Sequence, residues 1–176
     1  MIDEIKQLIL KIISKLVNAN QSAKLQGVQF GNNCSFGKNN KFMSEPYLIK
    51  IGDDFSSSSN VNFVTHDGSM RVIRVLYPQY KNMDLFGKIL IKNNVFIGVN
   101  VTILPNTIID NNVIVGAGSI VKGHLKENSV YAGIPAKFIC TVDEYLEKNE
   151  CFFDKTKHLD KSRKKEYLMK KYNYEK

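Results

Sequence analysis

A six-residue repeat in the middle of the chain constrains the fold more than any other feature of the sequence. From residue 91 the chain divides into IKNNVF, IGVNVT, ILPNTI, IDNNVI, VGAGSI and VKGHLK. One repeated position is always aliphatic, with the members Ile91, Ile97, Ile103, Ile109, Val115 and Val121. A second position, two residues earlier, is aliphatic in most repeats and polar at Thr107 and Ser119. We expect the side chains at these two positions to point inward and sideways.

Short strands and tight turns are the local structures that this repeat favours. Branched aliphatic side chains prefer extended backbone, and strands of about three to five residues interrupted by Gly, Asn or Asp do not continue as helices. Residues that tolerate left-handed backbone angles stand where turns are needed, at Gly98, Asn106, Asn112 and Gly116. Three such faces closing into a coil would stack the aliphatic residues into one interior. The sequence therefore predicts a mainly β fold, a single-stranded parallel β-helix.

The repeat continues upstream in a weaker form and is interrupted once. Aromatic residues six positions apart precede a change of phase at Phe30, Phe36 and Phe42. The same spacing returns afterwards at Ile51, Ser57 and Phe63. We therefore place the β-helix over residues 25–140, with a protruding loop over residues 67–88, where no period persists. Long loops in compact domains are commonly functional.

Both ends of the chain are predicted to be helical. Apolar residues recur at helical spacing between Ile2 and Leu16, so residues 1–20 are expected to form an amphipathic helix. The favoured interpretation is a lid over the first coil, and the alternative is attachment to a membrane surface. Thr141 and Glu144 match a capping box, which predicts a helical, basic tail over residues 141–176.

The positive charge of the chain is concentrated in that tail. The formal net charge is +8, and residues 155–176 hold nine Lys or Arg against three Asp or Glu, a local charge of +6. A basic tail is more often a solvated helix face than a binding device, so nucleic acid is not expected as a partner. Attraction to phosphate or to a membrane surface is kept as the minority interpretation.

Cysteine usage and hydropathy narrow the cellular setting. Three cysteines, Cys34, Cys140 and Cys151, have no CxxC spacing and suggest neither a disulfide framework nor a zinc knuckle. The longest apolar run is too short for a membrane span, and no signal-peptide pattern is visible. We expect a cytoplasmic protein with reduced cysteines.

The segment IGVNVTILPNTIIDNNVIVGAGSIVKGHLKENSVYAGIPAKFI resembles the signature region of the hexapeptide-repeat acyltransferases. Within that family it is similar to the maltose, galactoside and polysaccharide O-acetyltransferase branch. The resemblance covers residues 30–139 and implies a left-handed parallel β-helix. It also implies a homotrimer, with acetyl-CoA bound as acyl donor along the cleft between neighbouring subunits.

The resemblance implies that His66, in the sequence VTHD, is the catalytic base. An imidazole titrates near neutral pH and can take a proton from an acceptor hydroxyl as it attacks a thioester. Taken alone, a His before Asp-Gly is usually a turn residue. Asp67 could orient the imidazole or simply form the turn, two interpretations of equal weight. Glu45 and Asp53 are weaker carboxylate candidates.

Donor contacts are expected from small residues and nearby lysines. Small side chains would let an extended pantetheine arm lie against the coil at Gly116, Ala117, Gly118 and Ser119, although any turn of this repeat favours such residues. Lys122 and Lys137 could neutralise the phosphates of the coenzyme. The segment AGIPAK, which contains Pro135 and Lys137, resembles the AGxPAK of the family.

The acceptor side is less defined by the sequence. Relatives that acetylate sugars commonly use an asparagine from an earlier coil, for which Asn39 and Asn40 are the candidates. Arg71 and Tyr77 give the loop a hydrogen-bond donor and a stacking face suited to a sugar. The predicted function is O-acetylation of a sugar hydroxyl in a surface polysaccharide or its precursor.

Several other functions remain open at this point. N-acetylation of a free or nucleotide-linked amino sugar is one alternative, and a non-catalytic β-helix scaffold is another. The β-helix carbonic anhydrases need three histidines around a metal ion, whereas His66, His124 and His158 are widely separated here. We therefore expect no metal.

Overall fold

The computed structural model of the chain describes residues 17–174. Most of the predicted helix over residues 1–20 lies outside these described residues. At its predicted end, Asn18 has extended backbone and caps a separate helix, α2 (Ala19–Gln26), by accepting a hydrogen bond from the Gln21 N–H. Helix α2 was not predicted from the sequence, and it includes residue 25, the predicted first residue of the β-helix.

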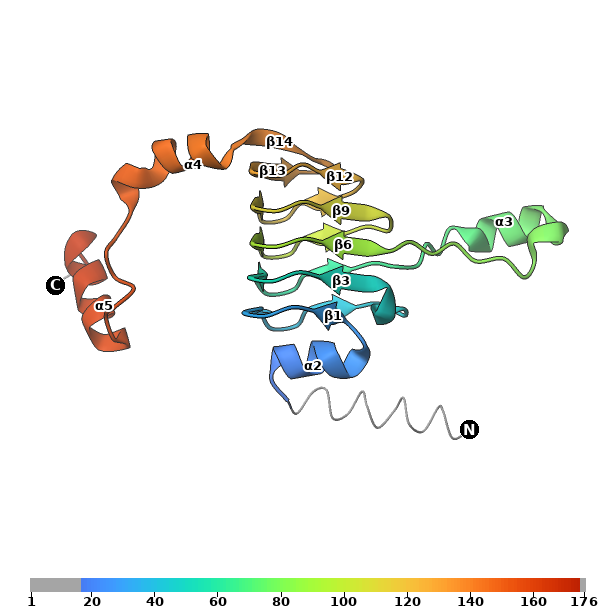
Figure 1. Ribbon diagram of the computed structural model, residues 1–176, viewed down its shortest axis with the longest axis horizontal. Helices are drawn as coiled ribbons and strands as arrows, with labels where there is room; N and C mark the ends of the chain where they lie inside the picture. Colours follow the sequence, from blue (N-terminus) through green and yellow to red (C-terminus); the bar gives the residue numbers. More distant parts are fainter. Residues whose placement is uncertain (1–16, 175–176) are drawn as a thin grey trace. The chain divides into compact units, whose positions relative to one another are not determined.

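The central part of the chain forms a parallel coil whose walls are three sheets, A, B and C. The chain passes through sheets A, B and C in that order in each coil (Figure 1). Sheet A contains β1 (Gln29–Phe30), β3 (Ile49–Ile51), β6 (Ile89–Ile91), β9 (Thr107–Ile109) and β12 (His124–Leu125). Sheet B contains β4 (Ser56–Ser57), β7 (Val95–Ile97), β10 (Val113–Val115), β13 (Ser129–Gly133) and β14 (Ala136–Thr141). Sheet C contains β2 (Lys41–Phe42), β5 (Asn62–Phe63), β8 (Thr102–Ile103) and β11 (Ile120–Val121). All pairings are parallel except that of β13 with β14, which confirms the predicted parallel β-helix.

Three edges join the sheets, and we name each edge by the sheets it connects. The A–B edge contains the left-handed residues Asn33, Asp54, Asn94, Asn112 and Asn128. The B–C edge contains Asn39, Asn60, Asn100 and Gly118 in the same conformation, and the C–A edge contains Asn106 and Gly123. Asparagine takes up this conformation at low cost because its short side chain can bond locally. These turns repeat at corresponding positions of successive coils.

Two of the four predicted turn residues have a different role. Asn106 and Asn112 have positive φ, as predicted, whereas Gly98 and Gly116 do not. A Cβ atom on Gly98 would lie 2.6 Å from the backbone nitrogen of Ala117 on the next coil. Glycine is therefore needed at Gly98 for close stacking of coils rather than for a left-handed angle.

The interior is filled by both repeated positions. The first position is at most 1% exposed from Ile91 to Val121. The second position is also buried, so its predicted sideways direction is wrong. Thr107 and Ser119 fit inside because their hydroxyls donate to the carbonyls of Leu104 and Gly116, at 2.6 and 2.7 Å. In the first two coils the interior also contains aromatic rings, with Phe42 stacked on Phe63 at 5.0 Å between ring centroids.

The predicted loop over residues 67–88 contains helical structure that the sequence analysis missed. It leaves the coil after β5 and holds α3 (Met70–Leu76) and the 3₁₀ turn η2 (Pro78–Tyr80) before returning to β6 (Figure 1). We call residues 67–88 the arm. A second 3₁₀ turn, η1 (Pro46–Leu48), connects β2 to β3.

The C-terminal segment is helical. Thr141 and Glu144 form the reciprocal bonds of a capping box, with the Thr141 N–H donating to Glu144 at 2.7 Å and the Glu144 N–H donating to Thr141 at 3.1 Å. The elements that follow are α4 (Val142–Asn149), η3 (Glu150–Phe152) and α5 (Lys161–Lys171). The chain divides into two compact units between Tyr145 and Leu146.

Candidate active site

His66 lies on the C–A edge, where the chain leaves sheet C and enters the arm. The preceding residue, Thr65, is fully buried, and its carbonyl accepts a 2.9 Å hydrogen bond from the Gly87 N–H on the returning chain. His66 itself forms an antiparallel bridge with Phe86. The two legs of the arm are thus joined at its base, and this pairing fixes the backbone that carries the imidazole.

The arm encloses one side of the His66 imidazole. Its Nε2 atom is buried and lies 3.8 Å from Oδ1 of Asp84, an electrostatic contact longer than a hydrogen bond. The Phe86 ring lies 4.8 Å from the imidazole, centroid to centroid. Nevertheless, 32% of the His66 side chain remains exposed. One side of the ring is therefore held by protein and another is open to a ligand.

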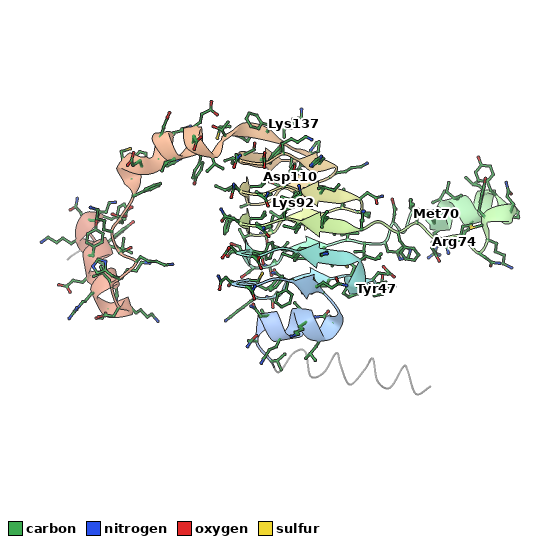
Figure 2. The ribbon with its side chains drawn as sticks, in the orientation of Figure 1. Tyr47, Met70, Arg74, Lys92, Asp110 and Lys137 are labelled. Atoms are coloured by element: carbon green, nitrogen blue, oxygen red, sulfur yellow. The ribbon has the colours of Figure 1, made fainter. Side chains whose placement is uncertain are left out.

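Asp84 is a neighbour of His66 that the sequence analysis missed. Its Oδ1 atom also forms a 3.0 Å ion pair with Nη1 of Arg74, which lies on α3 (Figure 2). Asp84 is 18 residues after His66, and no repeat in the arm relates the two positions. The one available signal was that Asp84 lies near the end of the arm, shortly before β6 begins at Ile89.

Asp67 has the role of a turn residue in the structure. Its Oδ1 atom accepts a 2.9 Å hydrogen bond from the Ser69 N–H, and its own N–H donates to the Leu85 carbonyl at 2.8 Å. Hydrogen bonds from Ser69 lower the pKa of the Asp67 carboxyl. The positive charge of Lys122 acts in the same direction.

The two weaker carboxylate candidates lie at different edges. Glu45 comes close to His66 because its Oε2 atom accepts a 3.2 Å hydrogen bond from the hydroxyl of Thr65. Asp53 lies on the A–B edge, where its Oδ1 atom accepts a 2.7 Å hydrogen bond from the Asn32 N–H. The structure therefore brings Glu45, and not Asp53, to the base of the arm.

The predicted donor turn lies on the B–C edge. Ala117 and Gly118 are exposed, and a Cβ atom on Gly118 would have no neighbour within 4 Å. Ser119 is fully buried. Its hydroxyl donates to Gly116 at 2.7 Å and accepts from the Gly133 N–H at 3.1 Å. Ser119 thus fixes the shape of the turn, while Ala117 and Gly118 present its open surface.

Lys137 and Pro135 lie above this turn, whereas Lys122 does not. Lys137 pairs with Ala132 across the β13–β14 hairpin, whose bend contains Pro135. A Cβ atom on Gly116 would lie 2.9 Å from the Cβ of Ala132, so these layers stack directly. Lys122 follows β11 and belongs to the C–A edge. The structure therefore separates Lys122 from the other predicted donor residues.

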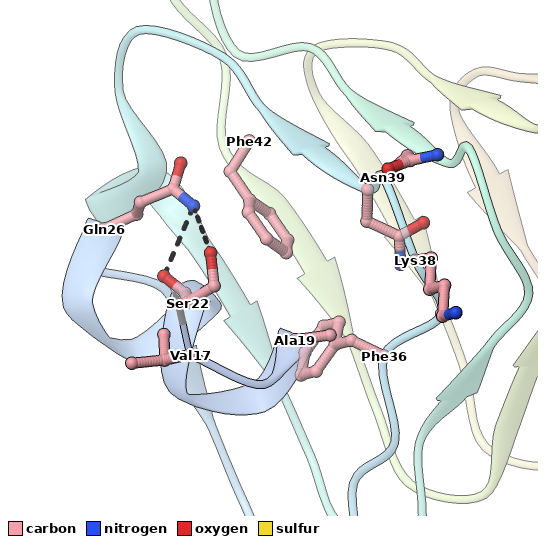
Figure 3. Close-up of a pocket in the computed structure, with 10 residues that line it drawn as sticks. Val17, Ala19, Ser22, Gln26, Phe36, Lys38, Asn39 and Phe42 are labelled. Atoms are coloured by element: carbon pink, nitrogen blue, oxygen red, sulfur yellow. Dashed lines mark hydrogen bonds between the residues drawn. The ribbon is translucent and has the colours of Figure 1, made fainter. Parts of the chain in front are cut away.

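The predicted acceptor residues are also separated. Asn39 and Asn40 lie on the B–C edge and line an open pocket of about 400 Å³ together with residues of α2 and the first coil (Figure 3). The side chain of Asn40 bonds to the Ser57 hydroxyl at 2.6 Å and to the Val61 N–H at 2.9 Å. Neither asparagine approaches His66, because both precede β2 whereas His66 follows its partner β5.

Arg71 and Tyr77 are exposed on the arm. Tyr77 makes an edge contact with Tyr80 at 6.4 Å between ring centroids. These side chains therefore belong to the same protruding segment as Asp84, the neighbour of His66.

The described residues also bear on two other functions, metal binding and membrane insertion. In residues 17–174, no three His, Cys, Asp or Glu side chains are arranged to hold a metal ion. Within the same range, no helix combines the length and the apolar character needed to cross a membrane. His124 instead lies beside Asp110, with 2.7 Å between its Nε2 atom and the carboxylate.

Comparisons with known proteins support this architecture. A family model described as "Bacterial transferase hexapeptide (six repeats)" matches residues 88–123. A hexapeptide-repeat-containing acetyltransferase of Vibrio cholerae O1 biovar eltor, solved in complex with acetyl coenzyme A, is similar in structure with a TM-score of 0.54. The two share 20% sequence identity over 75% of this chain and 82% of that chain. This likeness implies that the coil is a left-handed β-helix, as expected from the family resemblance.

Two relatives are similar in sequence. WbbJ of Escherichia coli (strain K12), named as a putative lipopolysaccharide biosynthesis O-acetyl transferase, is 55% identical over 51 residues, 29% of this chain and 26% of that protein. Protein CapG of Staphylococcus aureus is 43% identical over 169 residues, which cover 95% of this chain and 96% of CapG. Because the similarity to CapG extends over nearly both whole chains and the family model matches the repeat, this chain belongs to the hexapeptide-repeat acetyltransferase family.

Proposed function

We propose that the protein transfers an acetyl group from acetyl-CoA to a sugar hydroxyl, with His66 as the general base. One observation carries this proposal. The arm holds one side of the imidazole, including the buried Nε2 atom, while a third of the side chain stays open. A general base needs this combination, because it must be held in place and still reach the proton that it removes.

The reaction needs no covalent enzyme intermediate. His66 takes the proton from the acceptor hydroxyl as that oxygen attacks the thioester carbonyl carbon. The new C–O bond forms, the C–S bond breaks, and the imidazolium returns its proton to the departing thiolate. The products are the acetyl ester of the sugar and free coenzyme A. Asp67 contributes the turn that begins the arm.

The exposed turn on the B–C edge fits the acyl donor. The open space at Gly118 would be filled by any side chain, so this glycine leaves room for an extended ligand. Lys137 lies on the layer above and offers a positive charge to the coenzyme phosphates. Pro135 shapes the hairpin that presents it. We place this activity in the cytoplasm, the compartment that supplies acetyl-CoA.

The acceptor is assigned to a surface polysaccharide or its activated precursor. The name of WbbJ supports this class, because it describes O-acetyl transfer in lipopolysaccharide biosynthesis. The exposed side chains of Arg71 and Tyr77 offer a hydrogen-bond donor and a flat aromatic face to a saccharide. Asn39 and Asn40 would contact the acceptor only if the acceptor extends from His66 to the B–C edge.

A homotrimer accounts for two features of the single chain. His66 and the donor turn lie on different edges, so the predicted site is divided across sheet C. The arm also exposes large apolar side chains, with Val75 78% and Leu76 63% exposed. Three copies around an axis would place the C–A edge of one subunit beside the B–C edge of another and would cover the arm. Lys122 would then act beside His66 rather than beside Lys137.

Acetyl-CoA turnover tests the proposal directly. Free thiol release is measured with sugars, nucleotide sugars, amino sugars, serine and chloramphenicol as acceptors, for the unaltered protein and for His66→Ala. We expect acceptor-dependent release with a saccharide, reduced by about a hundredfold or more in the variant. A His66→Ala protein that keeps full turnover, with an unchanged melting temperature, contradicts the mechanism.

The same assay separates the alternatives. Preference for an amino sugar, with an amide as product, would identify an N-acetyltransferase. The absence of turnover with every acceptor, together with no coenzyme A binding by calorimetry, would favour the scaffold interpretation.

A further inference from the structure

Asp84 and His66 meet at the base of the arm although the chain between them forms α3 and η2. Oδ1 of Asp84 lies 3.8 Å from Nε2 of His66 and 3.0 Å from Nη1 of Arg74. Arg74 is fixed in turn, because its Nε atom donates a 3.2 Å hydrogen bond to the Met70 carbonyl one turn earlier in α3 (Figure 2). A continuous series of polar contacts therefore leads from α3 through Asp84 to the imidazole.

Other charged groups act on His66 from this edge. Asp67 follows it directly and is held by Ser69, while Lys122 is close enough to act on Asp67. Glu45 contacts Thr65 rather than the imidazole. Among the described residues, Asp84 is the carboxylate that forms an ion-pair contact with His66.

We propose that Asp84 is a positioning residue for His66, and that Arg74 holds Asp84 in place. This inference rests on the proposed function. Asp84 keeps a proton on Nε2, which leaves the lone pair on Nδ1 as the base that receives the acceptor proton. The burial of Nε2 supports this choice, because an acceptor hydroxyl cannot reach that atom in this arrangement.

The present 3.8 Å separation is compatible with this role. Catalytic hydrogen bonds are often long in the absence of substrate and shorten in the reacting complex. Shortening of this contact in the reacting complex would make it a hydrogen bond. The Phe86 ring, 4.8 Å from the imidazole, limits the other orientations that the ring can take. Acceptor binding against the arm would therefore also order the base.

Two variants of one ion pair give the test, because Asp84 contacts the imidazole, whereas Arg74 contacts Asp84. Asp84→Asn removes the carboxylate at almost constant size, and Arg74→Ala removes the group that holds it. The kcat and KM of acetyl transfer are measured for both. For Asp84→Asn we expect kcat to fall by about tenfold or more, with KM for acetyl-CoA nearly unchanged.

The two variants should lower kcat to different extents. Asp84→Asn removes the carboxylate that faces Nε2, so the tautomer and the orientation of the imidazole are no longer fixed. Arg74→Ala leaves that carboxylate in place and should lower kcat less. If the ion pair serves only to hold the arm, both variants break the same contact and lower kcat equally, which overturns the inference.

Controls separate this result from misfolding and from failure of the proposed function. Asp84→Glu, which restores the carboxylate, should recover part of the lost kcat. Asp154→Asn removes a carboxylate from another ion pair, with Lys171, and should leave kcat unchanged. If His66→Ala abolishes turnover while Asp84→Asn has normal kcat, the positioning role is wrong and the proposed function stands. If His66→Ala keeps full turnover, the proposed function itself fails.

Discussion

Oδ1 of Asp110 lies 2.7 Å from Nζ of Lys92, one coil away on the A–B edge (Figure 2). The two residues follow paired strands, because Lys92 comes after β6 and Asp110 after β9. His124, on the next coil, also contacts the Asp110 carboxylate at 2.7 Å. One carboxylate thus connects three successive coils, and this arrangement predicts how stability depends on pH.

We expect the protein to lose stability in acid partly through Asp110. The hydrogen bond from Lys92, assisted by His124, lowers the pKa of the Asp110 carboxyl. A lowered pKa in the folded state stabilises that state above the ordinary Asp pKa of about 3.9, and this contribution disappears as the pH falls through the folded value. Asp110→Asn should therefore unfold at a lower urea concentration than the unaltered protein at pH 7. Its free energy of unfolding should also decline less as the pH falls toward 3. Equal declines in the free energy of unfolding for Asp110→Asn and the unaltered protein would contradict this prediction. Asp143→Asn, which changes an exposed carboxylate, is the control.

The central interior should be sensitive to loss of volume. Ile103 is fully buried and lies in the sheet C column between Phe63 and Val121. Ile103→Ala should lower the free energy of unfolding by about 3 kcal/mol, because it removes apolar contacts and leaves a cavity. Val99→Ala, at a site that is 39% exposed, should change it by less than about 0.5 kcal/mol. Urea unfolding of both variants checks this prediction. Similar urea midpoints for Ile103→Ala and Val99→Ala would contradict a continuous packed core at Ile103.

A substitution at Gly118 should weaken donor binding while leaving the stability of the protein almost unchanged. It has a φ of 69°, and the matching positions on lower coils hold Asn39, Asn60 and Asn100 at similar angles. Gly118→Asn should therefore change the free energy of unfolding by less than about 1 kcal/mol. The new side chain fills the open space on the donor turn, so KM for acetyl-CoA should rise about tenfold. An unchanged KM would remove Gly118 from the donor site. Asn60→Gly is the matched control, and should leave KM unchanged.

The exposed arm should mediate assembly. Val75 is 78% exposed in the single chain although it is apolar. Val75→Glu should raise the dissociation constant of the proposed trimer by at least about tenfold, because it places an unpaired charge in a buried contact. Light scattering at micromolar concentration measures this, with Lys81→Glu on the same arm as the charge control. A monomeric unaltered protein would show that the arm has another role.

The regular part of the fold was predictable because its physical cause is local. A six-residue spacing of branched aliphatic residues requires short strands and turns, whatever lies elsewhere in the chain. The breaks at Thr107 and Ser119 did not disrupt the pattern, since each hydroxyl finds a backbone carbonyl nearby. The burial of the second position was missed, because spacing alone does not show how far the coil curves.

Local patterns were less informative for the helices and turns. The sequence MRVIRVL forms α3, although its branched residues favour strands more than helices. Gly98 looked like a left-handed turn residue, whereas its real constraint is the approach of Ala117 from the next coil. Such constraints come from neighbours that are distant along the chain, so a single segment does not contain them.

The sequence by itself determined the coil, the interruption at the arm and the position of His66 at the boundary between them, because these depend on periodicity along the chain. Tertiary structure alone decided which side chains meet there. It brought Asp84 and Glu45 to the base of the arm and left Asn39 and Lys137 on another edge. The physical reason is that stacking and the antiparallel return of the arm join residues with no fixed separation in sequence.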